Sequence, residues 1–169
     1  MKRTFPTGPL LLAFAVVLVD QITKALVVSR IPLHTIGAQY FGDFLRIIHV
    51  GNHAVAFSLG AGLPEGIRTL LFILLPVILL IGLTIYLVCS RDLTSLQRWS
   101  VGAILGGGTG NLIDRIFREG GVVDFIDVKF YGLFGLERWP TFNAADSSIV
   151  IGGILLIISI LTYKEPQHE

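Results

Sequence analysis

The chain has 169 residues, of which 53% are hydrophobic and 15% charged, and its formal net charge is +1. A mean hydropathy of +0.75 excludes an ordinary soluble domain, and the small net charge without a basic stripe excludes nucleic acid as a partner. The single cysteine, Cys89, excludes an intrachain disulfide, and we interpret it as a small residue packing in a membrane segment. Because no linker or low-complexity tract divides the sequence, we expect one membrane domain over residues 1–169.

The first apolar segment, residues 10–28, is long enough to cross a bilayer, which takes about 20 residues. Lys2 and Arg3 precede it, and a basic start before an apolar core also fits a cleaved signal peptide. The apolar run continues past Asp20 and Lys24, however, and no small-x-small cleavage site follows. We therefore expect a permanent transmembrane helix.

The next segment, residues 30–66, is rich in glycine and proline and predicts an extramembrane loop. Within it, residues 44–50 are β-branched and partly alternating, which favours a short strand. Residues 69–89 carry no charge and predict a second transmembrane helix. We expect this helix to tolerate Pro76, because neighbouring groups in a membrane span can satisfy the freed carbonyl.

Two further apolar segments, residues 99–117 and 147–163, predict the third and fourth transmembrane helices, joined by a second outer loop at 118–145. Four spans place both termini and the short 91–98 loop on one side of the membrane. Lysine and arginine are dense in these short segments, which predicts cytoplasmic termini. The expected fold class is an all-α membrane protein with two longer loops on the outer face.

In this topology, the first and third helices end, and the second and fourth begin, on the outer face. Every ionisable group expected inside the membrane therefore lies in one leaflet, which is typical of a functional site. These groups are Asp20, Lys24, Asp114, Arg115 and Asp146, with the polar Asn111 beside them.

Asp20 and Lys24 are four residues apart and share one helical face. They either neutralise each other, or leave Lys24 to hold a substrate carbonyl or a neighbouring polar group. Asn111, Asp114 and Arg115 fall within about one helical turn. We expect Asp114 and Arg115 to hold each other or an extramembrane loop.

Glycines recur every four residues in the third predicted helix, at Gly102, Gly106 and Gly110. Such a ridge of small residues lets helices approach closely. The GGGTG run over residues 106–110 lacks the lysine and the preceding strand of a phosphate-binding loop, so helix packing explains it better.

Two aspartates are candidates for acid–base chemistry. Asp124 lies among apolar residues of the second outer loop, where burial would raise its pKa, and Asp127 competes for the same role. Asp146 stands at the mouth of the fourth helix, where a simple N-cap role is the structural alternative. Two carboxylates held together in a site of low dielectric constant tend to share one proton. One can then activate water while the other protonates a carbonyl, as in aspartic proteases.

Other chemistries fit less well. The chain has no HExxH motif, and its four histidines are not spaced as metal ligands, so we expect neither a metal nor a cofactor. Ser147 and Ser148 have no histidine nearby in the sequence to act as a base, which argues against a serine triad.

Five ordered motifs closely resemble the bacterial lipoprotein signal peptidases (signal peptidase II) over nearly the whole chain. They are Asp20-Gln21-x-x-Lys24, Asn52-x-x-x-Ala56-Phe57-Ser58, Gly110-Asn111-x-x-Asp114-Arg115, Val122-Val123-Asp124-Phe125 and Phe142-Asn143-x-Ala145-Asp146-Ser147. The resemblance implies a monomeric aspartic endopeptidase of the bacterial inner membrane, active toward the outer leaflet and in contact with membrane lipid. It would cut prolipoproteins before a diacylglyceryl-modified cysteine. It also implies four transmembrane helices, a small β-rich cradle and a half-helix over the active site, and inhibition by globomycin-type peptides.

By this resemblance, Asp124 and Asp146 match the catalytic dyad. The positions that match substrate-binding or supporting residues are Asp20, Lys24, Asn52, Gly110, Asn111, Asp114, Arg115, Asn143 and Ala145. We expect the glycine ridge to leave room for the helical signal peptide of the substrate. Ala54 replaces a glycine usual in the family, which puts the local loop geometry in question but not the dyad.

Two hypotheses from other classes remain open. A small membrane transporter or channel subunit would use the intramembrane Asp, Lys and Arg groups as an ion path. Against it, the second predicted helix has no charge and the polar groups occupy a single leaflet. A non-catalytic lipoprotein-binding chaperone would keep its function without the two aspartates.

Overall fold

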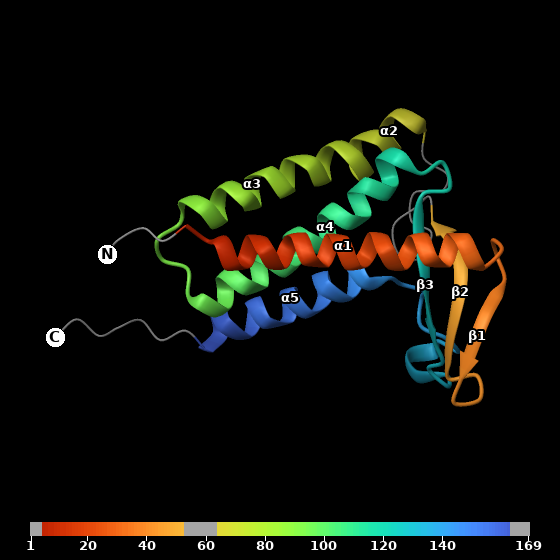
Figure 1. Cartoon of the computed structure of the whole chain (residues 1–169). Helices are drawn as coiled ribbons and strands as arrows, with labels where there is room; N and C mark the ends of the chain where they lie inside the picture. Colours follow the sequence, from red (N-terminus) through yellow and green to blue (C-terminus); the bar gives the residue numbers. More distant parts are fainter. Residues whose placement is uncertain (1–4, 53–63, 163–169) are drawn as a thin grey trace.

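The computed structural model describes residues 5–52 and 64–162, which form a helical bundle with a small sheet at one end (Figure 1). The long helices are α1 (Thr7–Arg30), α3 (Leu75–Cys89), α4 (Ser95–Phe117) and α5 (Ala144–Thr162). The start of α1, the α3–α4 connection and the end of α5 lie at the end of the bundle opposite the sheet (Figure 1). This arrangement agrees with the alternating topology expected from the sequence.

The sheet has three antiparallel strands in the order β1 (Ile36–Tyr40), β2 (Leu45–Asn52) and β3 (Val122–Val128). Strand β2 confirms the strand predicted over residues 44–50. Pairing of β2 with β3 places Val50 opposite Asp124 and Asn52 opposite Val122. The sheet therefore brings the end of strand β2 beside Asp124 of strand β3.

Three helical segments are long and apolar enough to cross a membrane: Thr7–Arg30, Gly66–Cys89 and Ala144–Thr162. They coincide with the first, second and fourth predicted spans, with slightly different ends. The predicted third span forms helix α4, but α4 is not among the three, because polar residues and glycines lower its hydropathy. Helix α4 packs against α1, α3 and α5, so much of its surface faces protein rather than lipid. Cys89 is exposed at the end of α3, so it does not pack into the interior of the bundle.

Pro76 sits in a helix that continues through it. A short helix, α2 (Glu65–Thr69), leads through a π-helical turn, η2 (Leu70–Leu74), into α3. The Leu75 N–H donates to the carbonyl of Leu70, one residue further back than in an α-helix. The widened turn lies directly before Pro76, where the proline ring would otherwise clash with the preceding turn. The predicted tolerance is confirmed, and the π-turn accommodates the proline.

Helix α4 uses different glycines to approach different neighbours. Gly102 and Gly106 face α1, and a Cβ on Gly106 would lie 2.7 Å from the carbonyl oxygen of Ala13. Gly107 faces α5, where a Cβ would clash with the backbone of Ala145. The predicted packing role of the ridge is therefore confirmed. The expectation that this ridge leaves room for a substrate helix is wrong, because α1 already fills it.

Candidate active site

Helix α5 begins with a reciprocal pair of hydrogen bonds. The Asp146 N–H donates to Asn143 Oδ1 (2.9 Å), and the Asn143 N–H donates to Asp146 Oδ2 (3.1 Å). Asn143 is therefore the N-cap and Asp146 the third residue of the helix, so the alternative of Asp146 as N-cap is wrong. Its carboxylate stands at the positive end of the helix dipole, which favours negative charge. The other oxygen, Oδ1, accepts a hydrogen bond from Asn111 Nδ2 (2.7 Å).

Strand β3 presents Asp124 and Asp127 on opposite faces, because side chains alternate along a strand. Asp124 Oδ1 accepts from Asn143 Nδ2 (2.7 Å), and its Oδ2 accepts from Asn52 Nδ2 (2.9 Å). Both carboxylate oxygens of Asp127 instead accept from Arg138 Nε (2.7 and 2.8 Å). The strand thus separates the two competitors: Asp124 joins the network around Asp146, and Asp127 forms an ion pair with Arg138.

Two asparagines connect the two carboxyl groups. Asn143 is fully buried, and its amide donates to both Asp124 and Asn111 Oδ1 (3.1 Å), while Asn111 donates to Asp146. Both aspartates line one cavity of about 580 Å³. Most of the other lining residues are apolar and come from α5 and the segment before it: Trp139, Pro140, Thr141, Phe142, Ser147, Ile149, Val150 and Ile151. Strands β2 and β3 and helix α4 contribute the rest: Asn52, Val122, Asn111 and Arg115.

Asp124 is set apart by its pKa. The pKa of this carboxyl is raised from 3.8 to about 6, mainly by burial and also by the nearby charge of Asp146, although hydrogen bonds from Asn52 and Asn143 lower it. Asp124 is only 4% exposed. Its carboxyl can therefore hold a proton much closer to neutral pH than an ordinary aspartate.

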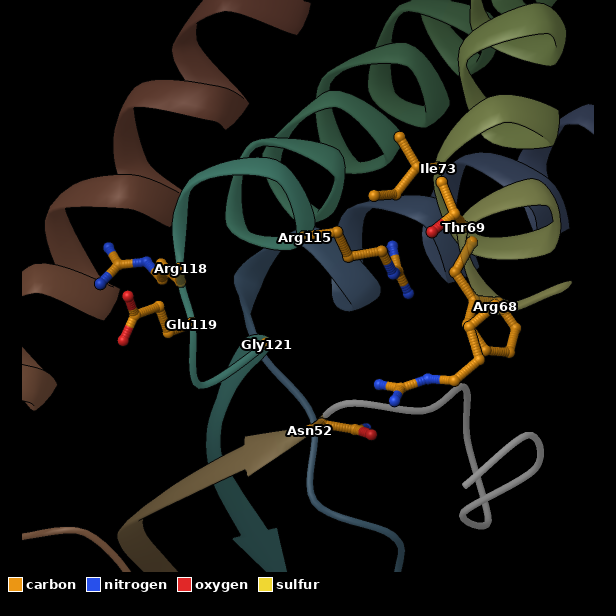
Figure 2. A pocket seen from close by; sticks show the side chains of 9 residues that line it. Asn52, Arg68, Thr69, Ile73, Arg115, Arg118, Glu119 and Gly121 are labelled. Carbon is orange, nitrogen blue, oxygen red and sulfur yellow. The ribbon is translucent and has the colours of Figure 1, made fainter. Parts of the chain in front are cut away.

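A second cavity of about 290 Å³ adjoins the first and is lined by three arginines, Arg68, Arg115 and Arg118. Asn52 and Arg115 line both cavities. Figure 2 shows Arg68 and Arg115 between the start of α2 and the end of α4, with Asn52 below them. Arg68 was not among the predicted site residues, because its place in a mixed, glycine-rich stretch gives no sign that the chain folds it back toward Asn52.

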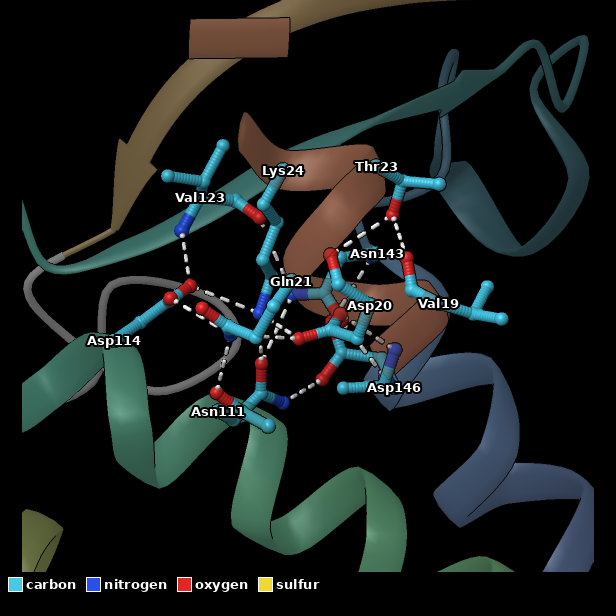
Figure 3. A network of polar contacts seen from close by, with 12 residues as sticks. Val19, Asp20, Gln21, Thr23, Lys24, Asn111, Asp114, Val123, Asn143 and Asp146 are labelled. Carbon is cyan, nitrogen blue, oxygen red and sulfur yellow. Dashed lines mark hydrogen bonds and ion pairs between the residues drawn. The ribbon is translucent and has the colours of Figure 1, made fainter. Parts of the chain in front are cut away.

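A buried charged cluster centred on Lys24 lies next to Asn111 and Asp146 (Figure 3). Lys24 Nζ contacts Asp20 Oδ2 (2.8 Å), Asp114 Oδ2 (2.8 Å) and Asn111 Oδ1 (2.9 Å), and all three charged side chains are 0% exposed. A lysine has three N–H groups, and all of them find partners here. Both alternatives therefore hold in part: Lys24 neutralises Asp20 and Asp114 and also holds the neighbouring polar Asn111, and it has no N–H left for a substrate carbonyl.

Each carboxylate of this cluster also holds the backbone beside one dyad residue. Asp20 Oδ1 accepts from the N–H of Ala145, which directly precedes one aspartate of the dyad. Asp114 Oδ2 accepts from the N–H of Val123, which directly precedes the other (3.2 Å). Asp114 therefore holds strand β3, and among the described contacts it is not paired with Arg115.

Two further residues complete the cluster. A Cβ on Gly110 would lie 2.7 Å from Asp20 Oδ2, so only glycine leaves room for that carboxylate. Gln21 Nε2 lies within hydrogen-bonding distance of Asp20, the Gly110 carbonyl and Asp114 (3.1–3.2 Å). Gln21 belongs to the Asp20-Gln21-x-x-Lys24 motif but was not among the predicted site residues. Its polar amide inside an apolar segment could have indicated a place in the site. Ala54, the departure from the family pattern, lies outside the described residues.

Comparison with known proteins agrees with this geometry. A family model described as signal peptidase (SPase) II matches residues 12–162. The lipoprotein signal peptidase of Treponema denticola is 52% identical and covers 95% of this chain and 92% of its own length. That of Borrelia hermsii is 46% identical and covers 96% and 94%. A solved structure described as a bacterial membrane enzyme, determined by the in meso method at 2.3 Å resolution, is 30% identical with a TM-score of 0.82 and covers 99% and 98%.

These relatives leave no support for the transporter or chaperone hypotheses, since the curated relatives are named as peptidases over most of their length. The buried cluster agrees, because Lys24, Asp20 and Asp114 are closed off from solvent rather than arranged along a path. The chain belongs to the signal peptidase II family, the lipoprotein signal peptidases, as its motifs predict.

Proposed function

We propose that this membrane peptidase cleaves diacylglyceryl-modified prolipoproteins before the lipidated cysteine, with Asp124 and Asp146 as its catalytic dyad. One observation carries the proposal. Two carboxyl groups from separate elements, β3 and α5, line a single cavity and are joined through Asn143, whose side-chain amide donates to Asp124 and whose backbone N–H donates to Asp146. Such a pair can divide the roles of base and acid between its members.

The environments of the two aspartates suggest how the roles divide. Asp146 stands at a helix N-terminus, which favours negative charge, so it serves as the base that takes a proton from water. The water oxygen bonds to the scissile carbonyl carbon, and Asp124, whose pKa is raised, gives its proton to the carbonyl oxygen. As the C–N bond breaks, Asp146 passes its proton to the leaving nitrogen and Asp124 regains one from the resulting diol. Both aspartates return to their starting states.

The surrounding residues divide into three groups by the contacts described above. Asn52, Asn111 and Asn143 orient the carboxyl groups, and Arg115, which lines both cavities, is placed to bind substrate. The scaffold under the dyad consists of Asp20, Lys24, Gly110, Asp114 and Ala145.

The proposed membrane arrangement is supported by the order of the helices and by the density of lysine and arginine in the short segments. We assign all of residues 1–169 to one domain with four spans, α4 being the enclosed one. Both termini are cytoplasmic, and the sheet forms the outer-face cradle. The far end of this cradle carries exposed aromatic side chains, Phe41, Tyr131 and Phe134, beside Lys129, a combination that suits the lipid headgroup region.

The substrate fits this depth. A lipid-modified cysteine keeps its acyl chains in the bilayer, so its scissile bond lies near the interface, where α4 ends and α5 begins. The apolar part of the larger cavity, including Ile149, Val150 and Ile151, suits those chains. Because one chain supplies the whole dyad and its supports, a monomer suffices.

The test is cleavage of a diacylglyceryl-prolipoprotein by the purified enzyme in lipid nanodiscs. Asp124→Asn and Asp146→Asn should each abolish cleavage while the purified proteins keep their helical circular-dichroism spectrum. Normal turnover by either variant would remove that aspartate from the dyad.

A further inference from the structure

The smaller cavity carries a positive charge that the cleavage step does not use. Three arginines, Arg68, Arg115 and Arg118, lie on its wall, and Arg118 also pairs with Asp114 (2.8 Å). Among the lining residues described, Glu119 is the one carboxylate. Glu119 is exposed and lies with Arg118 on the other side of the end of α4 (Figure 2). The part of the cavity that faces Asn52 is therefore cationic.

The cationic cavity is continuous with the dyad. Asn52 and Arg115 line both cavities, and Asn52 Nδ2 donates to Asp124 Oδ2 (2.9 Å). The space beside Arg68 is therefore separated from the dyad only by the boundary that Asn52 and Arg115 form between the two cavities. At about 290 Å³ the cavity is at the lower end of the range for small-molecule sites, about 300–1,000 Å³, so it fits the end of a peptide but not a helix.

Hydrolysis creates an anion at this point. Water adds across the scissile amide, so the signal peptide gains a carboxylic acid and the lipidated cysteine gains an amine. The acid then ionises to a carboxylate, and the amine takes up a proton. The new carboxylate forms between two aspartates in a buried site, where like charges repel strongly. Arginine is the side chain that best binds a carboxylate, through paired N–H groups.

We propose that Arg68, together with Arg115, receives the C-terminal carboxylate of the released signal peptide and draws it away from the dyad. This inference rests on the proposed function, since the carboxylate exists only where cleavage takes place. It makes Arg68 a product-binding residue and predicts that the free-acid signal peptide inhibits the enzyme more strongly than its amide.

Equilibrium binding tests the proposal without requiring turnover. Two dye-labelled signal peptides ending at the cleavage position, one a free carboxylate and one a carboxamide, are titrated against the full chain in zwitterionic nanodiscs. The acid should bind wild type about tenfold more tightly than the amide, as expected for a hydrogen-bonded charge pair. The ratio should fall close to one in Arg68→Gln and recover in part in Arg68→Lys. It should stay near tenfold in Arg91→Gln, whose side chain is exposed in the α3–α4 connection.

Equal binding of acid and amide by wild type, or a ratio unchanged in Arg68→Gln, overturns the proposal. A phospholipid phosphate is the competing anion, so the titration is repeated in nanodiscs that contain phosphatidylglycerol. Lipid binding that depends on Arg68, with no preference for the peptide acid in either membrane, overturns the proposal in favour of a lipid site. None of these outcomes touches the proposed function, which fails only if wild type does not cleave or the dyad variants do.

Discussion

Replacing Lys24 with methionine should destabilise the protein more than replacing any surface lysine. The substitution keeps the length of the side chain but changes the net charge of Asp20, Lys24, Asp114 and Arg118 from zero to −1. Asp114 keeps Arg118 at 2.8 Å, so the carboxylate left without a cation is that of Asp20, which is 0% exposed. Removing one partner of a buried ion pair costs about 3–5 kcal/mol, which corresponds to a Tm lower by about 6–20 °C for a chain of this size.

The assay is thermal unfolding in detergent micelles, with Lys129→Met as the matched control. Lys129 pairs with Asp43 at 3.0 Å, but their side chains are 23% and 39% exposed, so the control should lose at most about 1 kcal/mol. Adding Asp20→Asn to Lys24→Met should recover part of the loss, because it removes the stranded charge. A Tm for Lys24→Met equal to that of the control would refute the account of the cluster as a neutralised, tightly coupled unit.

The remaining predictions concern Asp124 and the glycines of α4. Because burial raises the pKa of Asp124 from 3.8 to about 6, the stability contributed by its protonated form is complete below pH 4 and is lost as the pH rises through 6. Unfolding measurements should therefore show wild type losing on the order of 2–3 kcal/mol of stability relative to Asp124→Asn between pH 4 and pH 7; parallel stability curves of the two proteins would contradict the raised pKa. The kcat/KM of wild type should fall as the pH rises above about 6. Gly107→Ala should cost about 1–3 kcal/mol and lower cleavage, because its Cβ meets the Ala145 backbone beside the dyad. Gly153→Ala, where a Cβ meets nothing within 4 Å, should change neither, and equal effects of the two alanines would contradict the close α4–α5 contact.

Much of the fold could be predicted because the apolar runs are long. Successive helices must run in opposite directions, which determines which helix ends lie at the same end of the bundle. Asp20, Lys24, Asp114 and Asp146 were expected in one leaflet, and the structure brings them into one network. Hydropathy was less informative for α4, since a helix enclosed by three others can carry glycines and polar groups that a lipid-facing helix cannot.

What the sequence did not predict depends on side-chain direction. Lys24 could turn either to substrate or to its neighbours, and only the packed position of Asp114 on another helix settles that choice. Asp124 and Asp127 were equivalent by composition; strand pairing and alternation separate them. Arg68 lies in a region with no periodic pattern, so its approach to Asn52 appears only in three dimensions.

The most direct test of the central claim compares Asp124→Asn with Asp127→Asn, two neutralising changes three residues apart on the same strand. Both carboxyl groups are buried, but only Asp124 shares a cavity with Asp146, while Asp127 is paired with Arg138. In single-turnover cleavage of a diacylglyceryl-prolipoprotein, Asp124→Asn should show no product, and Asp127→Asn should stay within about tenfold of wild type, since it removes no acid or base. Cleavage by Asp124→Asn at the wild-type rate, or loss confined to Asp127→Asn, would contradict the assignment of the dyad.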